Sequence, residues 1–462
     1  MLRNLVIAAA LPLASAVLLA PRCDAQRAAL DRVLHTDTLG NGLQVIVIEN
    51  HSIPIVTAEI VFRAGAMTQG EEDQGVPHLF EHMLFRSYRG NGDGPFERDA
   101  ARAHAAFNGA TSEEQVMYYL ALPSENTDDA LDILARLVRD VQFQNDDFQR
   151  ERFIVVNELQ RNGSDPRFHL GRETDVRLWG AGFRRKNAIG DEMSLMGVNT
   201  TQLQTIFQRY YVPNNAALIV SGDVSAARVM AMARSHFGSW KRKADPFVAN
   251  PVAPMPPLDS SRAVVITANV TTVSIELEWQ GPSVPSDAKG TYAADVLAEI
   301  VSDEQSDFHA RLVDSGLFQE ASLRYTTRSH VGPITFSGIT TPAKLATALT
   351  ALATELDFMD TPAYFNRASI VAATKRNEVA SVFQLEDAHS LALGLAETWA
   401  VAGTEYFRNY DDEMAAVTES DLHAYVDRYI ARRPFVIAAL VPPDRASETS
   451  ALLGEYLNLT KP

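Results

Sequence analysis

The sequence has a single cysteine, a deficit of basic residues and no long apolar segment. Cys23 is the only thiol in 462 residues, so the chain cannot form an internal disulfide. Lysine and arginine number 41 against 58 aspartates and glutamates, which gives a net charge of -17. Nucleic acids are held mainly by basic side chains that neutralise phosphates. This balance argues against a nucleic-acid partner.

The longest apolar run, Leu5 to Ala20, has sixteen residues, fewer than the roughly 20 that a membrane-spanning helix needs. This run, one early arginine and small residues before Gln26 are together typical of a secretory signal peptide. We therefore predict a signal peptide over residues 1–25, export to the periplasm of a Gram-negative bacterium, and no stable membrane anchor.

Two positions in this segment fit signal-peptide cleavage, after Ala16 and after Ala25. Cleavage after Ala25 removes Cys23 and leaves no unpaired thiol in an oxidising compartment. We therefore predict cleavage after Ala25, and a mature chain that begins at Val17 would contradict this prediction.

The rest of the chain has the composition of a folded globular protein, with 46% hydrophobic and 21% charged residues. A chain of this length exceeds one ordinary core and predicts two domains. Similar sequence returns at one constant offset along the chain: Val45 to Val47 match Val264 to Ile266, and far downstream Tyr210 matches Tyr429. One offset over such a distance indicates two homologous halves.

Between the halves, residues 241–260 contain five prolines and predict a linker. We assign an N-terminal domain to residues 26–240 and a C-terminal domain to 261–462. Strand pairs with β-branched residues alternate with long helical patterns in each half. The predicted fold class is α+β, with two homologous αβ-sandwich domains of about 220 residues each.

The stretch GVPHLFEHMLF, residues 75–85, places three titratable side chains in an apolar helical pattern. On a helix, His78 and His82 lie about 40° apart and roughly 6 Å along the axis, so both imidazoles can reach one ion. Imidazole nitrogen suits zinc, and a catalytic zinc site has three protein ligands and one open position. Glu81 on the same face is positioned to act as the general base on a water molecule.

The third ligand is expected in the helical segment Arg150 to Asn162, which carries Glu151 and Glu158 two turns apart on one face. From the pattern alone, either glutamate can be the ligand. The other glutamate can then hydrogen-bond to a ligand histidine and fix its tautomer and orientation. Two exposed helix glutamates are the plainer interpretation of the same spacing.

With its H-x-x-E-H motif, the sequence resembles the pitrilysin/insulinase family of zinc metallopeptidases. The stretches LGNGLQVIV, GVPHLFEHMLF, FNGATSEEQVMYY, ERFIVVNELQ and YYVPNNAALIVSGDV carry the resemblance, which extends over nearly all of the expected mature chain. In that family the third ligand is a glutamate about 76 residues beyond the second histidine. The resemblance therefore implies Glu158 as ligand, Glu151 as its support and a LuxS/MPP-like fold.

The resemblance also implies an endopeptidase that acts on small or unfolded peptides, with Glu81 as general base. The second half has Leu297, Ile300 and Val301 where the first has His78, Glu81 and His82. We therefore expect one Zn²⁺ per chain. Ligand type favours zinc but does not rule out manganese or cobalt.

A peptide substrate is expected to add to the edge of a sheet near the metal helix. Residues 115–121 alternate in the manner of a strand, and we expect that strand to form the edge. Asn108 and Gly109 match the start of the substrate-binding stretch of similar enzymes. Tyr118 and Tyr119 are explained equally well as core and rim of a sheet.

The sequence departs from the family at the group that would stabilise the oxyanion. Many relatives have an arginine and a tyrosine seven residues apart in the second half. Here Phe318 lies seven residues after Arg311, and Arg324 lies directly beside Tyr325. This favours a heterodimer with a homologous inactive subunit that carries the Arg/Tyr pair, and a homodimer is the alternative.

Two other functions remain open from the sequence. A catalytically silent structural or assembly subunit would have the same fold, and a metal-binding protein without turnover would have the same ligands. The intact set of His78, Glu81, His82 and Glu158 favours the enzyme, because a retired site does not need four buried polar groups.

Overall fold

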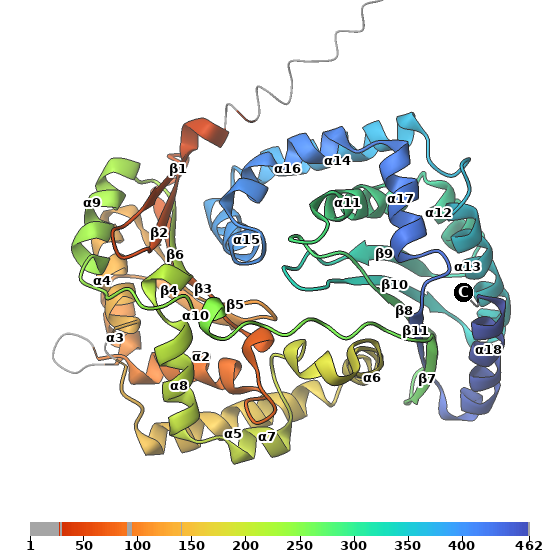
Figure 1. Ribbon diagram of the computed structural model, residues 1–462, viewed down its shortest axis with the longest axis horizontal. Helices are drawn as coiled ribbons and strands as arrows, with labels where there is room; N and C mark the ends of the chain where they lie inside the picture. The colour runs from red at the N-terminus through yellow and green to blue at the C-terminus, as the bar shows by residue number, and fades with distance from the viewer. Residues whose placement is uncertain (1–26, 28–29, 90–94, 140, 461–462) are drawn as a thin grey trace, which may run out of the picture.

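The chain forms two mixed β-sheets, each flanked by helices, in the computed structural model, which describes residues 27, 30–89, 95–139 and 141–460 (Figure 1). The predicted signal peptide and its cleavage positions lie outside the described residues. Within the described ranges, no helix combines the length and apolar character needed to cross a membrane.

The first sheet has six strands in the order β1-β2-β6-β3-β5-β4, of which only β2 and β6 pair in parallel. The strands are β1 (Leu34–Thr38), β2 (Gln44–Glu49), β3 (Ile55–Arg63), β4 (Ala106–Thr111), β5 (Gln115–Pro123) and β6 (Ala216–Gly222). The expectation that residues 115–121 form the edge is wrong. The edge is β4, and β5 lies between β3 and β4, because alternation identifies the two faces of a strand but not its place in the sheet.

The second sheet repeats this arrangement in the order β7-β11-β8-β10-β9. Its strands are β7 (Arg262–Thr267), β8 (Val273–Gln280), β9 (Glu320–Tyr325), β10 (Pro333–Thr340) and β11 (Phe435–Val441). Strand for strand, this order matches β2-β6-β3-β5-β4, and the first residues of β6 and β11 are separated by the same offset that relates Val45 to Val264. The predicted α+β fold of two homologous halves is confirmed.

Helices follow the strands in a matching order in both halves. The first half has α2 (Val76–Ser87), α3 (Phe96–Arg102), α4 (Thr127–Leu137), α5 (Asn145–Asn162), α6 (Pro166–Trp179), α7 (Glu192–Gly197), α8 (Thr200–Tyr210) and α9 (Ala226–Phe237). The second half has α11 (Ala288–Ser302), α12 (Asp307–His309), α13 (Leu345–Met359), α14 (Arg367–Gln384), α15 (Ala388–Val401), α16 (Thr404–Ala416), α17 (Glu419–Tyr429) and α18 (Ala446–Leu459). Between the sheets, residues 241–260 contain only the short helix α10 (Pro246–Ala249) and otherwise irregular backbone.

Each half contributes one helix that packs on the sheet of the other half. On β2, Val45 and Val47 point into the core formed with helices of the first half, while Ile46 and Ile48 point to the opposite face. That opposite face is covered by α15 from the second half, visible in blue beside the first sheet in Figure 1. In return, α6 of the first half packs on β11, where its Leu170 contacts the second sheet. Each sheet thus buries both faces only because the other half supplies a helix.

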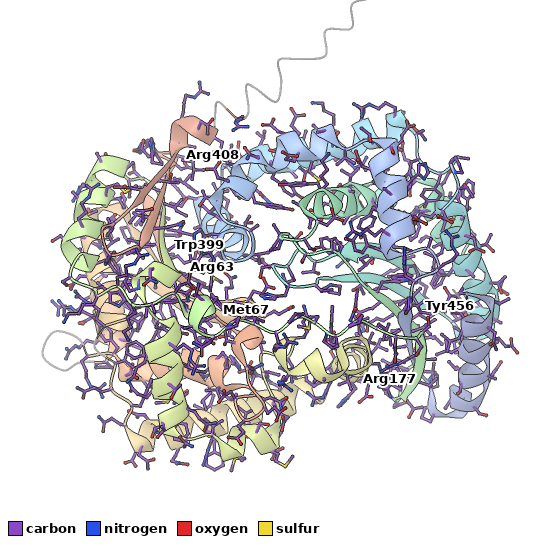
Figure 2. The ribbon with its side chains drawn as sticks, viewed as in Figure 1. Arg63, Met67, Arg177, Trp399, Arg408 and Tyr456 are labelled. Carbon is purple, nitrogen blue, oxygen red and sulfur yellow. The ribbon has the colours of Figure 1, made fainter. Side chains whose placement is uncertain are left out.

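Arg63 at the end of β3 fixes the position of α15. Its guanidinium lies 4.3 Å from the ring centroid of Trp399 and donates to the carbonyl oxygens of Trp399 at 3.1 Å and Ala400 at 3.2 Å. These carbonyls lie in the last turn of α15, where a positive charge is favoured by the helix dipole. Figure 2 shows Arg63 and Trp399 together at the boundary between the halves.

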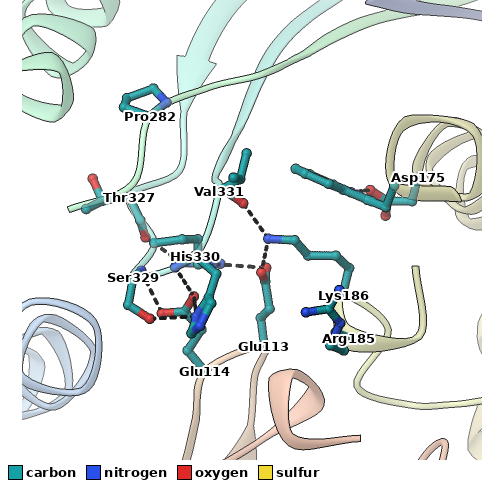
Figure 3. A network of polar contacts seen from close by, with 12 residues as sticks. Glu113, Glu114, Asp175, Arg185, Lys186, Pro282, Thr327, Ser329, His330 and Val331 are labelled. Atoms are coloured by element: carbon teal, nitrogen blue, oxygen red, sulfur yellow. Dashed lines mark hydrogen bonds and ion pairs between the residues drawn. The ribbon is translucent and has the colours of Figure 1, made fainter. Parts of the chain in front are cut away.

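The turn between β4 and β5 ties the first sheet to the second half (Figure 3). Glu113 forms an ion pair with Lys186 and accepts a hydrogen bond from Arg328 at 3.1 Å. Lys186 also donates to the carbonyl oxygen of Val331 at 2.5 Å. Burial raises the pKa of Glu113, and the two cations oppose this shift. Buried charges of this kind are tolerated because they are paired.

Glu114, the next residue, is almost fully buried and accepts hydrogen bonds from two backbone amides of the second half. The amides of Ser329 and His330 donate to its two carboxylate oxygens at 2.8 and 2.9 Å. Although burial raises the pKa of Glu114, the hydrogen bonds from His330 and Ser329 lower it below its usual value. Two consecutive glutamates therefore anchor the β4–β5 turn in the second half.

Glu59, in the buried interface between β3 and α15, differs from Glu113 and Glu114 in the surroundings of its carboxyl group. It lies between Thr57 and Val61 on the face of β3 that packs on α15, it is 0% exposed, and neither of its carboxylate oxygens has a hydrogen-bond partner among the described residues. Burial raises its pKa well above the usual value. The side chain therefore stays protonated in the folded chain at pH values where it ionises in the unfolded chain.

Replacing Glu59 with leucine is expected to raise the free energy of unfolding, by more at about pH 8 than at about pH 5. The wild-type chain loses stability as the pH rises from the unfolded pKa to the folded pKa of this group, by up to about 1.4 kcal/mol per pH unit. The leucine variant has no such loss. Urea unfolding of both chains at the two pH values measures the difference. Glu125→Leu, at an exposed position, is the control, and a pH-independent gain from Glu59→Leu would contradict the interpretation.

Candidate metal centre

The helix α2 carries the first part of the candidate site. It begins after Gly75, which has φ 79°, and a Cβ at this position would lie 2.8 Å from the carbonyl oxygen of Ile189. One face of α2 is buried in the core of the first half. The other presents His78, Glu81 and His82 to a cavity.

The helix α5 brings Glu158 to both histidines. Oε2 of Glu158 lies 3.9 Å from Nε2 of His78 and 3.8 Å from Nε2 of His82. One ligand atom from each residue lies within 4.8 Å of the other two. Two imidazole nitrogens and one carboxylate oxygen at this spacing can hold a zinc ion and leave a position open.

Glu151, two turns earlier on α5, contacts His82 from the other side. Its Oε2 lies 3.3 Å from Nδ1 of His82, and its Oε1 accepts a hydrogen bond from Nε of Arg86 at 2.7 Å. A carboxylate on Nδ1 fixes the tautomer with a free Nε2, which faces Glu158. The helical pattern alone left both glutamates as candidate ligands, and the family resemblance implied Glu158. The geometry gives the two glutamates different positions.

The electrostatics of the two histidines differ. Burial, and then the neighbouring His82, lower the pKa of His78 to about 4, so this imidazole is neutral and available as a ligand. Burial also lowers the pKa of His82, but the hydrogen bond to Glu151 and the nearby carboxylates of Glu81 and Glu158 raise it on balance. A cation among these carboxylates is therefore electrostatically favoured.

The carboxyl of Glu81 is held by β4. Thr111 donates from Oγ1 to Oε2 of Glu81 at 2.8 Å. Burial raises the pKa of Glu81, and the hydrogen bond from Thr111 opposes this shift. A Cβ on Gly109 would lie 2.9 Å from Oε1 of Glu81 and 3.0 Å from the ring of Phe85, so the close approach of β4 to α2 requires glycine.

Thr111 was not among the site residues expected from the sequence. The sequence feature that could have identified Thr111 is the alternation along β4, which places Gly109 and Thr111 on one face of the strand. It could not be used before β4 was known to lie beside α2.

These residues surround a cavity of about 520 Å³. Asn108 and Gly109 line it from β4, together with Phe107, Ala110 and Thr111. Glu97 and Arg86, which are joined by a hydrogen bond of 3.0 Å, also line it. All the site residues expected from the sequence therefore contact one cavity.

The arginines and aromatic residues considered for the oxyanion are not at this cavity. Arg311 makes two hydrogen bonds to the buried carboxylate of Glu355, at 2.5 and 3.0 Å. Phe318 is buried, and the hydroxyl of Tyr325 donates to the carbonyl oxygen of Pro282 at 3.0 Å. None of the three lines the cavity beside His78.

In the second half, the corresponding helix α11 buries Leu297, Ile300 and Val301 in an apolar core. Among the described residues, the set of His78, His82 and Glu158 is the one group of histidine, cysteine and acidic side chains with the spacing of a metal site.

Comparisons with known proteins agree with this arrangement. The family model "Insulinase (Peptidase family M16)" matches residues 44–174, which include all of α2 and α5, and "Peptidase M16 inactive domain" matches residues 197–363. The zinc protease PqqE of Helicobacter pylori is 24% identical over 287 residues, which are 60% of this chain and 63% of that protein. The chain thus spans less than two thirds of this relative's length.

Solved structures show the same fold. A protease from Helicobacter pylori superimposes with a TM-score of 0.79 at 20% identity, over 88% of this chain and 99% of that chain. The periplasmic protease PqqL from Escherichia coli superimposes with a TM-score of 0.73 at 18% identity, over 93% of this chain but 50% of that chain. With matches to both domains of the family and to its characteristic two-sheet fold, the chain belongs to peptidase family M16, the pitrilysin/insulinase family.

Proposed function

We propose that this chain is a zinc-dependent endopeptidase that hydrolyses small or unfolded peptides and binds one Zn²⁺. The observation that carries the proposal is the convergence of His78, His82 and Glu158 within 4.8 Å of one another, with the carboxyl of Glu81 in the same cavity. The names of zinc proteases among the relatives support the choice of metal and reaction.

Zinc bound by such a set supplies a Lewis acid that polarises a carbonyl group and lowers the pKa of water. Glu81 takes the proton from the attacking water and returns it to the leaving amine. The raised pKa of its carboxyl suits a group that must both accept and donate this proton. Thr111 keeps the carboxyl aimed into the cavity, and Glu151 keeps Nε2 of His82 facing Glu158.

The substrate is proposed to bind along β4. This strand ends the sheet, so one row of its backbone groups is available to pair with an extended peptide. Asn108 and Gly109 lie in β4 at the cavity wall, where backbone pairing would bring a peptide bond to the metal. Backbone pairing provides affinity without strong sequence preference, as expected for a peptidase of unfolded chains.

We further propose a partner and a location. The support is that Arg311 and Tyr325, the residues of the second half considered for the oxyanion, do not line the cavity and are engaged by Glu355 and by Pro282. A homologous inactive subunit with the Arg/Tyr pair would supply the donor for the oxyanion, and a homodimer with a different donor is the alternative. The Escherichia coli protease PqqL is a longer chain, of which this chain matches 50%. Export to the periplasm is proposed from the amino-terminal sequence.

Glu81→Gln is expected to lower kcat for peptide hydrolysis by at least about a hundredfold, because glutamine cannot accept a proton. Zinc content should not change, since glutamine still accepts the hydrogen bond from Thr111. Peptide cleavage and zinc analysis of the same preparation measure both. A silent subunit or a simple metal-binding protein would show no hydrolysis to lose, and full activity in Glu81→Gln would remove this residue from its role.

Glu158→Gln and Glu151→Gln are expected to weaken zinc binding to different degrees. The first removes a ligand and should cost more affinity than the second, which loosens His82 and should cost about 10-fold to 100-fold. Competition with a chelator gives both affinities. Glu192→Gln, on an exposed part of α7, is the matched control. Equal affinity of wild type and Glu158→Gln would contradict the proposed ligand set.

The partner proposal predicts slow hydrolysis by the purified chain and a large increase when a co-encoded homologue with the Arg/Tyr pair is added. An oxyanion donor is worth about 10²-fold to 10³-fold in kcat. Rates with and without the homologue, with size-exclusion chromatography of the mixture, decide the question. If the chain alone is as fast as the mixture, the heterodimer is wrong, and a dimer of one chain type would then favour the homodimer.

A further inference from the structure

A second cavity, of about 470 Å³, lies where the two halves meet. Its wall is formed by residues of helices α14, α15 and α16, by the end of β9, and by Leu30 of the first half. Since α15 also covers the first sheet, an occupant of this cavity would contact the helix that joins the halves. The wall includes Asn377 of α14, which is the counterpart of Glu158 at the constant offset between the halves, so the cavity adjoins the position that corresponds to the metal centre.

Asp295 of α11 is the notable acid in this wall. Its Oδ2 accepts a hydrogen bond from the hydroxyl of Tyr410 at 2.8 Å, and in the described part of the chain no cation pairs with it. Burial raises the pKa of Asp295 to about 7, and the nearby Glu299 adds to the shift. A carboxyl in such surroundings gains from a cation that enters the cavity, because its charged form is then compensated.

Three tyrosines line the cavity with Asp295: Tyr325, Tyr406 and Tyr410. The hydroxyls of Tyr325 and Tyr406 are engaged outside the wall, with the carbonyl oxygen of Pro282 and with Thr291 at 2.9 Å, while that of Tyr410 donates to Asp295 itself. The aromatic side chains of these residues are thus part of the wall that an occupant would contact, and one face of the Tyr406 ring is stacked on Tyr292 with 4.8 Å between the ring centroids. Aromatic ring faces attract organic cations, and more strongly in a desolvated site.

The arginines in the wall do not favour an anion. Arg27 pairs with Asp412 at 2.9 Å, and Arg408 pairs with Asp31 at 3.3 Å. Arg328 is held by Glu113 and Glu397 at 3.1 and 3.4 Å. Each guanidinium is thus neutralised by carboxylates of the protein itself.

We propose that this cavity binds a small organic ammonium ion, with the ammonium group beside the carboxylate of Asp295 and against the rings of Tyr325, Tyr406 and Tyr410. The volume falls in the range of small-molecule sites, and the wall combines aromatic and aliphatic side chains with polar and charged ones. A ligand that spans this boundary stabilises the packing of α15 on the first sheet by mass action.

The test compares choline with 3,3-dimethylbutan-1-ol, which has the same shape but a carbon in place of the charged nitrogen. Calorimetry on the full chain at millimolar ligand is expected to show choline binding at least tenfold more tightly than the neutral alcohol. Choline should also raise the melting temperature. The measurement needs neither zinc nor peptidase activity, so its outcome is independent of the proposed function. No choline binding, or equal binding of the two compounds, overturns the proposal.

Two variants locate the site. Asp295→Asn keeps the hydrogen bond from Tyr410 but removes the charge, and should weaken choline binding at least tenfold. Asp444→Asn removes the same charge from an exposed position and should have no effect.

Gly394→Leu serves if Asp295→Asn does not fold. Gly394 of α15 lines the cavity, and a Cβ there meets nothing within 4 Å, so leucine can fill the space while favouring the helix. Gly171→Leu in α6 is the matched control, because its Cβ also meets nothing and it is not part of the wall. Loss of choline binding in Gly394→Leu alone is the expected result, and unchanged binding in Gly394→Leu overturns the proposed location.

Discussion

The structure depends on how the two faces of each sheet are buried. Helices of the same half cover one face, and a helix of the other half covers the opposite face. Ile46, Ile48 and Val61 form an apolar surface on the first sheet, and α15 of the second half covers it. The second sheet has a similar surface, which α6 of the first half covers through Leu170 and Trp179. Because each half leaves apolar area exposed without the other, the hydrophobic effect favours docking of the halves as well as folding of each.

This packing of the halves is connected to the candidate metal centre through β4. All the candidate ligands and Glu81 belong to the first half, but the strand that holds Glu81 ends in the turn with Glu113 and Glu114. Those glutamates are bound by Arg328, Ser329 and His330 of the second half. The half without candidate metal ligands therefore contributes to the position of Glu81, and its own cavity with Asp295 occupies the boundary on the other side of α15.

Local patterns carried much of the prediction. The spacing of His78 and His82 defines one helical face, and the constant offset between similar stretches defines the duplication that the matching strand orders confirm. The family resemblance selected Glu158 over Glu151, and the distances to the two histidines are consistent with that selection. The alternation in residues 115–121 led to the wrong edge strand, because an inner strand whose two faces pack differently alternates in the same way.

The sequence by itself determined the helix faces, the duplicated fold and the residue types of the candidate ligand set, because these follow from periodicity and residue type along the chain. Only the tertiary structure decided that β4 is the free edge and that Thr111 holds Glu81. It also decided that α6 packs on the second sheet and α15 on the first. The physical reason is that these relations join segments far apart in the chain. Their geometry is set by how whole layers pack, and no local pattern records it.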